Sequence, residues 1–206
     1  MVCSRNQSRG HCAMKKILKG IVQAISLACA FPFALLSLFG RIEPLYLIGA
    51  ECFALLPGLP GDYVRIAYYR LTLEKCALES RIQFGSFFAH PRAAVGRDVY
   101  IGGYCVLGCT SIGDRTHLAS GVQILSGRHQ HGRDSAGNLL GANQSAFETV
   151  LIGSDCWIGA GAIVMADVGP GTTIGAGAIV SKPIPPGTVA VGNPARVIKT
   201  IDEQVR

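Results

Sequence analysis

From Val95 onward, a large aliphatic residue recurs at about every sixth position of the chain. Most of these residues are followed directly by Gly or Ala, as in Ile101-Gly102, Ile112-Gly113 and Ile158-Gly159. An α-helix would repeat its apolar stripe every 3.6 residues and a hairpin strand would alternate with period two, so neither explains the spacing. Short strands that are joined by tight turns and stacked coil on coil do explain it. The pattern therefore predicts an all-β solenoid.

Two sets of residues are predicted to point into the core of this solenoid. The large set is Ile82, Phe88, Val95, Ile101, Leu107, Ile112, Leu118, Ile124, Ile152, Ile158, Val164, Ile174 and Val180. The smaller set, four positions further along a coil, is Val99, Cys105, Thr116, Val122, Cys156, Ala162 and Ala178. The glycines beside the large set permit the backbone angles that the turns need. Cys packs as a small hydrophobe in such positions, so we expect Cys105 and Cys156 to be structural.

The repeat stops between Ile124 and Ile152, where a long polar segment, residues 126–149, takes its place. Loops of more than about 12–15 residues in a compact domain tend to be functional or disordered. This loop carries His129 and His131, two of the five histidines in the chain. A neutral imidazole with a pKa near 6.5 can take a proton from a hydroxyl at pH 7. Both histidines are therefore candidates for a general base.

The N-terminal part of the chain has a different pattern. An uncharged stretch, Gly20–Phe39, reaches the length of about 20 residues that a membrane-spanning helix needs, and it follows Arg5, Arg9, Lys15, Lys16 and Lys19. A second apolar run, Leu45–Leu56, is too short to span a bilayer, and Pro57-Gly58-Leu59-Pro60-Gly61 closes it.

Four interpretations of this N-terminal segment compete. Ala28-Cys29-Ala30 has the small-x-small form of a signal-peptidase site. A true span would leave the basic N-terminus inside, whereas a pair of helices in the interface would keep both flanks in the cytosol. A helical hairpin that covers a core is the fourth. We expect membrane association without a full crossing. The chain then divides into an apolar helical segment (1–61), a connecting segment (62–81) and a β-helix domain (82–206).

Composition narrows the function. With 49% hydrophobic and 16% charged residues, the chain does not have the composition of a disordered protein. The eight cysteines form no CxxC motif, which favours reduced thiols in a cytosolic compartment. No run of basic residues interleaved with aromatics points to nucleic acid. The net charge of +6 instead fits a phosphorylated ligand or an anionic membrane surface.

The repeats, together with Trp157-Ile158-Gly159-Ala160 and the closing Gly192–Ile198 segment (GNPARVI), carry a family resemblance. Over roughly residues 82–199 the chain resembles the hexapeptide-repeat acyltransferases, above all the branch of sugar, capsule and colanic-acid O-acetyltransferases. The resemblance implies a left-handed parallel β-helix and a homotrimer with active sites between neighbouring subunits. It also implies acetyl-CoA as co-substrate and no metal.

The resemblance also implies roles for individual residues. The cofactor-binding positions fall on Ala160, Ala176, Ser181, Lys182, Arg196 and Lys199. The family's histidine base, on a loop that reaches over the neighbouring subunit, falls on His129, with His131 within reach on the same face of an extended segment. Asp114 and Glu148 are candidates for binding the acceptor hydroxyl or for orienting the histidine.

The acceptor is less defined by the sequence. The coil before the histidine loop, Tyr104–Ser111, contains no acidic residue, which argues against a simple sugar acceptor. The apolar N-terminal half favours a lipid-linked intermediate of exopolysaccharide or capsule assembly, and a cytoplasmic protein peripheral to the inner face of the cell membrane. The alternatives are a non-enzymatic trimeric scaffold on a membrane surface and a γ-carbonic-anhydrase-like zinc enzyme, whose histidine spacing the chain does not match.

Overall fold

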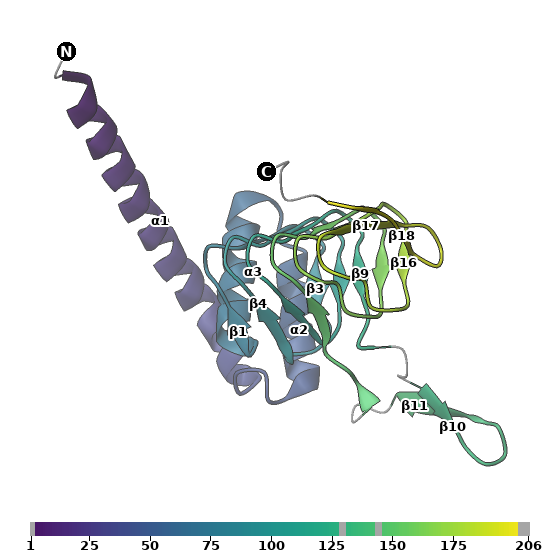
Figure 1. Ribbon diagram of the computed structural model, residues 1–206. Helices are drawn as coiled ribbons and strands as arrows, with labels where there is room; N and C mark the ends of the chain where they lie inside the picture. Colours follow the sequence, from purple (N-terminus) through teal and green to yellow (C-terminus); the bar gives the residue numbers. More distant parts are fainter. Residues whose placement is uncertain (1–2, 128–130, 143–145, 202–206) are drawn as a thin grey trace.

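The computed structural model describes residues 3–127, 131–142 and 146–201. Three helices come first and a solenoid of short strands follows (Figure 1). The helices are α1 (Cys3–Leu36), α2 (Glu43–Ala54) and α3 (Gly58–Thr72). The N-terminal half of α1 projects away from the rest of the molecule, whereas α2 and α3 lie against the first coils (Figure 1).

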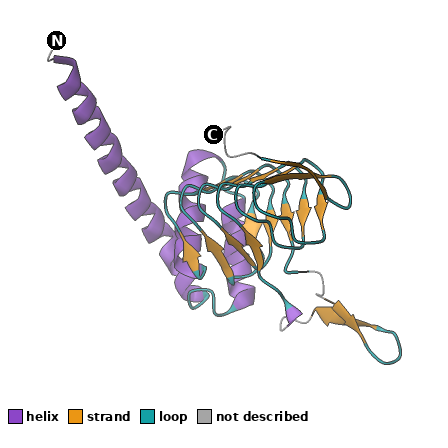
Figure 2. Cartoon of the chain, in the orientation of Figure 1, coloured by secondary structure: helices purple, strands orange, loops and turns teal. Residues whose placement is uncertain are grey.

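Three parallel sheets, here named A, B and C, form the walls of the solenoid (Figure 2). Sheet A consists of β1 (Lys75–Cys76), β4 (Ala93–Val95), β7 (Thr110–Ile112) and β12 (Val150–Ile152). Sheet B contains β2 (Arg81–Ile82), β5 (Tyr100–Ile101), β8 (His117–Leu118), β13 (Trp157–Ile158), β15 (Thr173–Ile174) and β17 (Thr188–Val191). Sheet C contains β3 (Phe87–Phe88), β6 (Val106–Leu107), β9 (Gln123–Ile124), β14 (Ile163–Val164) and β16 (Ile179–Val180).

The chain passes through sheets A, B and C in turn, and each passage is one coil. Single bridges at Val168 and Ile184 extend sheet A beyond β12. After the last coil, β18 (Arg196–Thr200) folds back antiparallel to β17. A separate antiparallel hairpin of β10 (His131–Arg133) and β11 (Leu139–Ala142) belongs to the long loop.

The predicted ladder is confirmed. Every residue of the large set is at most 2% exposed and every residue of the smaller set at most 3%. In sheet B, for example, Ile101, Leu118 and Ile158 occupy the same register on successive strands. The coils stack so closely that a Cβ added at Gly159 would lie 2.4 Å from the backbone nitrogen of Ala176. Glycine is therefore required beside the ladder at this turn.

The structure differs from the expectation in two places. The ladder begins at buried Cys76, one coil wall before Ile82. The segment Pro57–Gly61 does not only close an apolar run but also starts the third helix, α3. Pro60 lies in the first turn of that helix, where its missing N–H removes no helical hydrogen bond.

A buried arginine joins the helices to the solenoid. Arg65 of α3 is fully buried, and its Nε donates to the carbonyl of Ile82 on β2 at 2.9 Å. Its Nη1 donates to the carbonyls of Phe53 and Leu56 at the end of α2, and its Nη2 lies 2.6 Å from Asp62 Oδ1. Burial lowers the pKa of Arg65, and Asp62 opposes that shift. One side chain thus connects two helices and the first coil.

Three buried tyrosines make the same connection. Tyr46 donates its hydroxyl to the carbonyl of Phe88 at 3.0 Å, and the backbone N–H of Phe88 donates to the Tyr69 hydroxyl at 3.2 Å. Tyr68 donates to the carbonyl of Tyr46 at 2.7 Å, and burial raises the pKa of Tyr68 to about 12. Each hydroxyl is therefore hydrogen-bonded inside an otherwise apolar cluster, as buried polar groups must be.

Candidate active site

A row of small residues follows the corner at which sheet B turns into sheet C. Ser120, Ala160 and Ala176 occupy this corner on three successive coils and define the small-residue row. The N–H of Gly161 donates to the carbonyl of Ser120 at 3.1 Å, and the N–H of Gly177 donates to the carbonyl of Ala160 at 2.8 Å. All three row residues are exposed or partly exposed, so the corner leaves room for an extended ligand along stacked backbone.

The basic residues that were predicted to hold the donor fall into two places. Arg196 and Lys199 are exposed on β18, opposite Val191 and Val189 of sheet B. A Cβ at Gly175 would lie 2.7 Å from the Val191 side chain, so Val191 lies on the coil next to Ala176, and Arg196 pairs with Val191 from β18. Ser181 and Lys182 instead follow sheet C, at the corner with sheet A.

The loop that interrupts the ladder leaves from this other corner, between sheets C and A. Buried Ser126 accepts the N–H of Cys109 on its hydroxyl at 2.9 Å, and its carbonyl accepts the N–H of Glu148 at 3.1 Å. Gly127 has φ +83°, and a Cβ there would lie 2.8 Å from a Glu148 carboxylate oxygen. Ser126, Gly127 and Glu148 therefore form the base of the loop.

Of the two candidate histidines, His129 lies outside the described residues. His131 is exposed on β10, and its Nδ1 lies 3.3 Å from the carbonyl oxygen of Leu140. A carbonyl can only accept a hydrogen bond, so this contact favours the tautomer with the proton on Nδ1. The lone pair is then on Nε2, where a base needs it. The hairpin that carries His131 extends away from the solenoid (Figure 1).

The structure separates the two candidate acids. Asp114 lies at the corner between sheets A and B, where its Oδ1 accepts the N–H of Arg97 at 2.8 Å. That hydrogen bond and the charge of Arg97 lower the pKa of Asp114. Glu148 lies at the base of the loop. Only Glu148 is therefore close to the segment that carries the histidines.

The C-terminal end of the loop contacts His90 and Arg92, between β3 and β4, and through His90 it is linked to α2, which the sequence does not indicate. His90 Nδ1 lies 2.9 Å from Glu43 Oε1 in the first turn of α2, and the His90 ring packs against Phe147 at 4.9 Å. Arg92 donates to the carbonyl of Phe147 at 3.0 Å. The end of the loop is therefore connected to the helical part of the chain.

Sequence reasoning also missed an outward aromatic column on sheet B. Tyr100, His117 and Trp157 pair in register on successive strands, and the Tyr100 and His117 rings lie 5.7 Å apart. Each comes directly before a large ladder residue. Reading the residue before every ladder position would have revealed this column.

No group of three or more His, Cys, Asp or Glu side chains is placed to hold a metal ion among the residues that the structure describes. Over the same residues one helical segment, Lys16–Leu36, is long and apolar enough to cross a membrane.

The sequence matches no protein-family model and no curated protein. Solved structures do resemble it. A maltose O-acetyltransferase from Clostridium difficile 630 is 26% identical, with a TM-score of 0.62 over 82% of this chain and 89% of that one. A hexapeptide-repeat-containing acetyltransferase from Vibrio cholerae is 17% identical, with a TM-score of 0.63 over 81% and 93% of the two chains. The latter is also known in complex with acetyl coenzyme A.

These likenesses confirm the predicted fold. The Vibrio structure supports the fold alone, whereas the Clostridium enzyme adds sequence identity over most of both chains. The chain therefore has the left-handed parallel β-helix fold of hexapeptide-repeat acetyltransferases, and its likeness to the Clostridium protein supports an enzyme of the acyltransferase class.

Proposed function

We propose that this protein transfers an acetyl group from acetyl-CoA to a hydroxyl of a sugar or glycan intermediate. The observation that carries the proposal is the combination of an open small-residue row with a histidine-bearing loop that interrupts the ladder. Similarity to an O-acetyltransferase of the same fold supports it.

The small-residue row suits the long arm of the donor. Ala160 and Ala176 project no more than a methyl group from the corner, so an extended chain can lie along them. Arg196 and Lys199 are exposed next to the last coil and can bind the phosphates, because charged hydrogen bonds to phosphate are the strong ones. Ser181 and Lys182 would reach the donor from the neighbouring corner.

Acetyl-CoA, when bound, supplies the thioester that is attacked. The imidazole of His129 or His131 accepts the proton of the acceptor hydroxyl as its oxygen attacks the thioester carbon, and Glu148, at the base of the same loop, is the candidate for orienting it. Asp114 remains a candidate for binding the acceptor. The C–S bond of the thioester then breaks, and coenzyme A leaves as the free thiol with the proton that the imidazolium returns. The transfer is direct, so no protein nucleophile and no acyl-enzyme are required.

The positions of the loop and the row support an assembly of several copies. The loop base lies at the corner between sheets C and A, whereas the row lies at the corner between sheets B and C. A loop that extends outward from one copy is suited to reach the row of the next. We therefore propose a homotrimer whose active sites lie between subunits.

The exposed apolar residues support a membrane surface as a partner. They concentrate on α1, on the turn after it and at the ends of α2, and include Ile17, Leu18, Ile21, Phe31, Leu36 and Leu55. Lys16 and Lys19 are exposed at the start of the apolar part of α1. A basic and apolar helix of this kind binds anionic bilayers. We propose a cytoplasmic protein at the inner face of the cell membrane that acetylates a lipid-linked glycan of exopolysaccharide or capsule assembly.

Titration with acetyl-CoA tests the donor. We expect saturable binding below millimolar concentration by calorimetry, with release of free thiol when acceptor is present. Because charged hydrogen bonds contribute about 1.5–3 kcal/mol each, Arg196→Ala should weaken binding at least about tenfold. Arg41→Ala, an exposed arginine far from the row, should have no effect. Absence of binding at millimolar acetyl-CoA would contradict the proposal.

Sedimentation with lipid vesicles tests the membrane partner. We expect the chain to bind vesicles rich in phosphatidylserine and to bind phosphatidylcholine vesicles more weakly. Each basic residue near an anionic surface contributes about 1 kcal/mol, so Lys16→Gln should lower the partition about fivefold. Added salt should also lower the partition onto these vesicles, because it screens the attraction between the basic residues and the anionic surface. Protein that stays in the supernatant with both vesicle types would refute the membrane part.

A further inference from the structure

An apolar groove lies between α1 and α3. It has a volume of about 400 Å³, and its lining includes Val22, Ile25, Cys29, Leu59, Tyr63 and Val64. The lining is almost wholly apolar, and Cys29 is exposed at its edge. A groove of this composition is suited to a hydrocarbon chain, because burial of each methylene is favourable.

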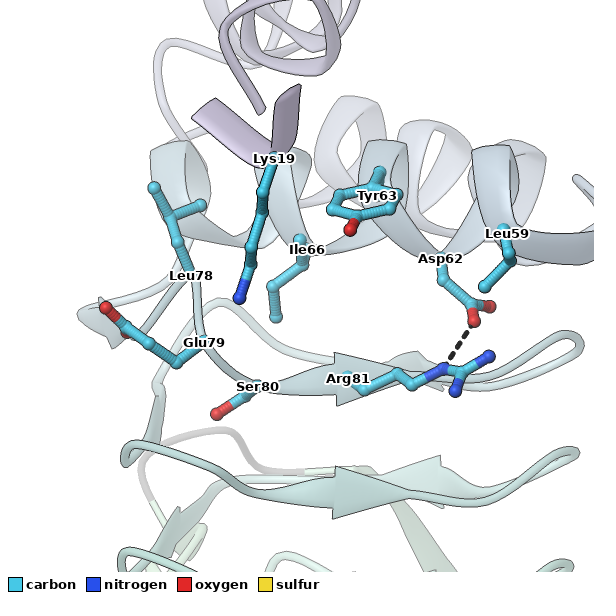
Figure 3. Close-up of a pocket in the computed structure, with 9 residues that line it drawn as sticks. All are labelled: Lys19, Leu59, Asp62, Tyr63, Ile66, Leu78, Glu79, Ser80 and Arg81. Carbon is cyan, nitrogen blue, oxygen red and sulfur yellow. Dashed lines mark hydrogen bonds and ion pairs between the residues drawn. The ribbon is translucent and has the colours of Figure 1, made fainter. Parts of the chain in front are cut away.

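A second pocket, of about 170 Å³, lies beside the groove and shares Leu59 and Tyr63 with it. It is here named the polar pocket after its charged lining residues Lys19, Asp62, Glu79 and Arg81. In Figure 3, Lys19 extends from α1 into this pocket toward the strand that carries Arg81. Arg81 is half-exposed, and its Nε lies 2.7 Å from Asp62.

The charges of the pocket favour an anion. Asp62 is already bound by buried Arg65 at 2.6 Å as well as by Arg81. Lys19 forms no ion pair with any residue in the described part of the chain. Glu79 is the other acid of the lining. Among the lining residues, Lys19 and Arg81 balance Asp62 and Glu79, and buried Arg65, which contacts Asp62 from outside the lining, adds one further positive charge next to the pocket at pH 7.

A third hollow connects this pocket to the small-residue row. It has a volume of about 420 Å³, shares Leu59, Asp62 and Arg81 with the polar pocket, and extends past Gly103 to Ser120. Ser120 is the first residue of the row. Tyr104, which is 66% exposed, forms one side of this hollow. The apolar groove, the polar pocket and the third hollow therefore adjoin one another in a series, here called the path, that reaches Ser120 of the row.

We propose that this path is a binding site for an anionic amphiphile such as a lipid-linked sugar phosphate. The hydrocarbon chain occupies the apolar groove, and Lys19 and Arg81 bind the phosphate. The sugar extends past Tyr104 toward Ser120, where the row would hold the acyl donor. The site's role as an acceptor site rests on the proposed function, but the binding itself does not.

Calorimetric titration of the full chain with decyl phosphate, below the concentration at which it forms micelles, tests the site. We expect saturable binding to one site, with affinity rising about fourfold for each methylene between octyl and decyl phosphate. Butyl phosphate and inorganic phosphate should bind at least 100-fold more weakly, and decyl maltoside, which has the chain without the charge, should bind more weakly than decyl phosphate.

Two pairs of variants locate the site. Cys29→Trp fills the apolar groove and should weaken decyl phosphate binding at least tenfold, whereas Leu35→Trp, on the same helix but outside the groove, should leave it unchanged. Lys19→Gln should weaken binding at least fivefold and Lys16→Gln should not. We expect both lysines to contribute to vesicle binding. A loss of decyl phosphate binding in the Lys19 variant but not in the Lys16 variant would therefore report on the pocket and not on attraction to a bilayer.

The outcomes that would overturn the site are distinct. Uptake without saturation, or equal binding by Cys29→Trp and Leu35→Trp, would mean partition onto the apolar surface. Equal affinity for decyl and inorganic phosphate would mean a free-phosphate site. Acetyl-CoA binding is measured on the same samples. Its loss alone would contradict the proposed function, and loss of decyl phosphate binding alone would contradict the amphiphile site.

Discussion

Replacing His129 with alanine is expected to lower kcat/KM for acetyl transfer by a factor of about 10²–10⁴, the contribution of a general base. His131→Ala is expected to lower it less. Thiol release from acetyl-CoA in the presence of acceptor measures both variants.

A control variant and two alternative outcomes test the assignment of the base to His129. His117→Ala removes an exposed imidazole on sheet B, away from the loop, and should retain activity. If His131→Ala shows the larger loss, the base is His131, whose Nδ1 contact with Leu140 leaves Nε2 free. If neither variant in the loop loses more than the His117 variant, a histidine base in this loop is refuted.

Replacing Arg65 with leucine is expected to lower the free energy of unfolding by about 3–5 kcal/mol, the usual cost of breaking a buried ion pair. The change leaves Asp62 with one fewer cation and leaves the carbonyls of Ile82 and Leu56 without this donor. Urea unfolding followed by circular dichroism measures the effect.

Arg115→Leu is the matched control. Arg115 makes a two-point contact with Asp155, at 2.8 and 2.7 Å, but both side chains are exposed to solvent. An exposed ion pair contributes at most about 1 kcal/mol. Equal losses in the two variants would show that Arg65 does not join the helices to the solenoid.

The sequence predicts the solenoid well because its signal is local and repeated. Each coil must stack an aliphatic residue on the aliphatic residue of the coil before it. Only a small residue fits the tight turn that follows each of these aliphatic residues. Ile101 and Leu118 therefore stand out without any knowledge of long-range contacts, and both are buried as predicted.

The helical part is predicted less well because the arrangement of its helices depends on contacts with the solenoid. Pro57 and Pro60 read locally as a break, yet the helix that they begin is joined to the solenoid by hydrogen bonds of Arg65 and Tyr69 to backbone groups at Ile82 and Phe88. These partners lie 17 and 19 positions away, beyond the reach of any local pattern.

The candidate site shows the same division. Ala160 and Ala176 follow from the repeat, and the structure places both in one row. The corner at which the loop leaves the solenoid depends on how many strands precede it, and the repeat alone does not give that number. The sequence therefore did not predict that Asp114 and Glu148 lie at different corners. The path from Lys19 to Ser120 joins residues about 100 positions apart and required the three-dimensional arrangement.

The two ends of the solenoid have a consequence for aggregation. Stacked strands expose unpaired backbone at their first and last members, and such edges can recruit strands from other molecules into fibres. Here α3 packs beside β1 and β2, while β18 folds back on β17 and presents Arg196 and Lys199 outward. At these places the sheet ends are covered by a helix or carry charges, which disfavours strand addition there and favours side-by-side association of further copies.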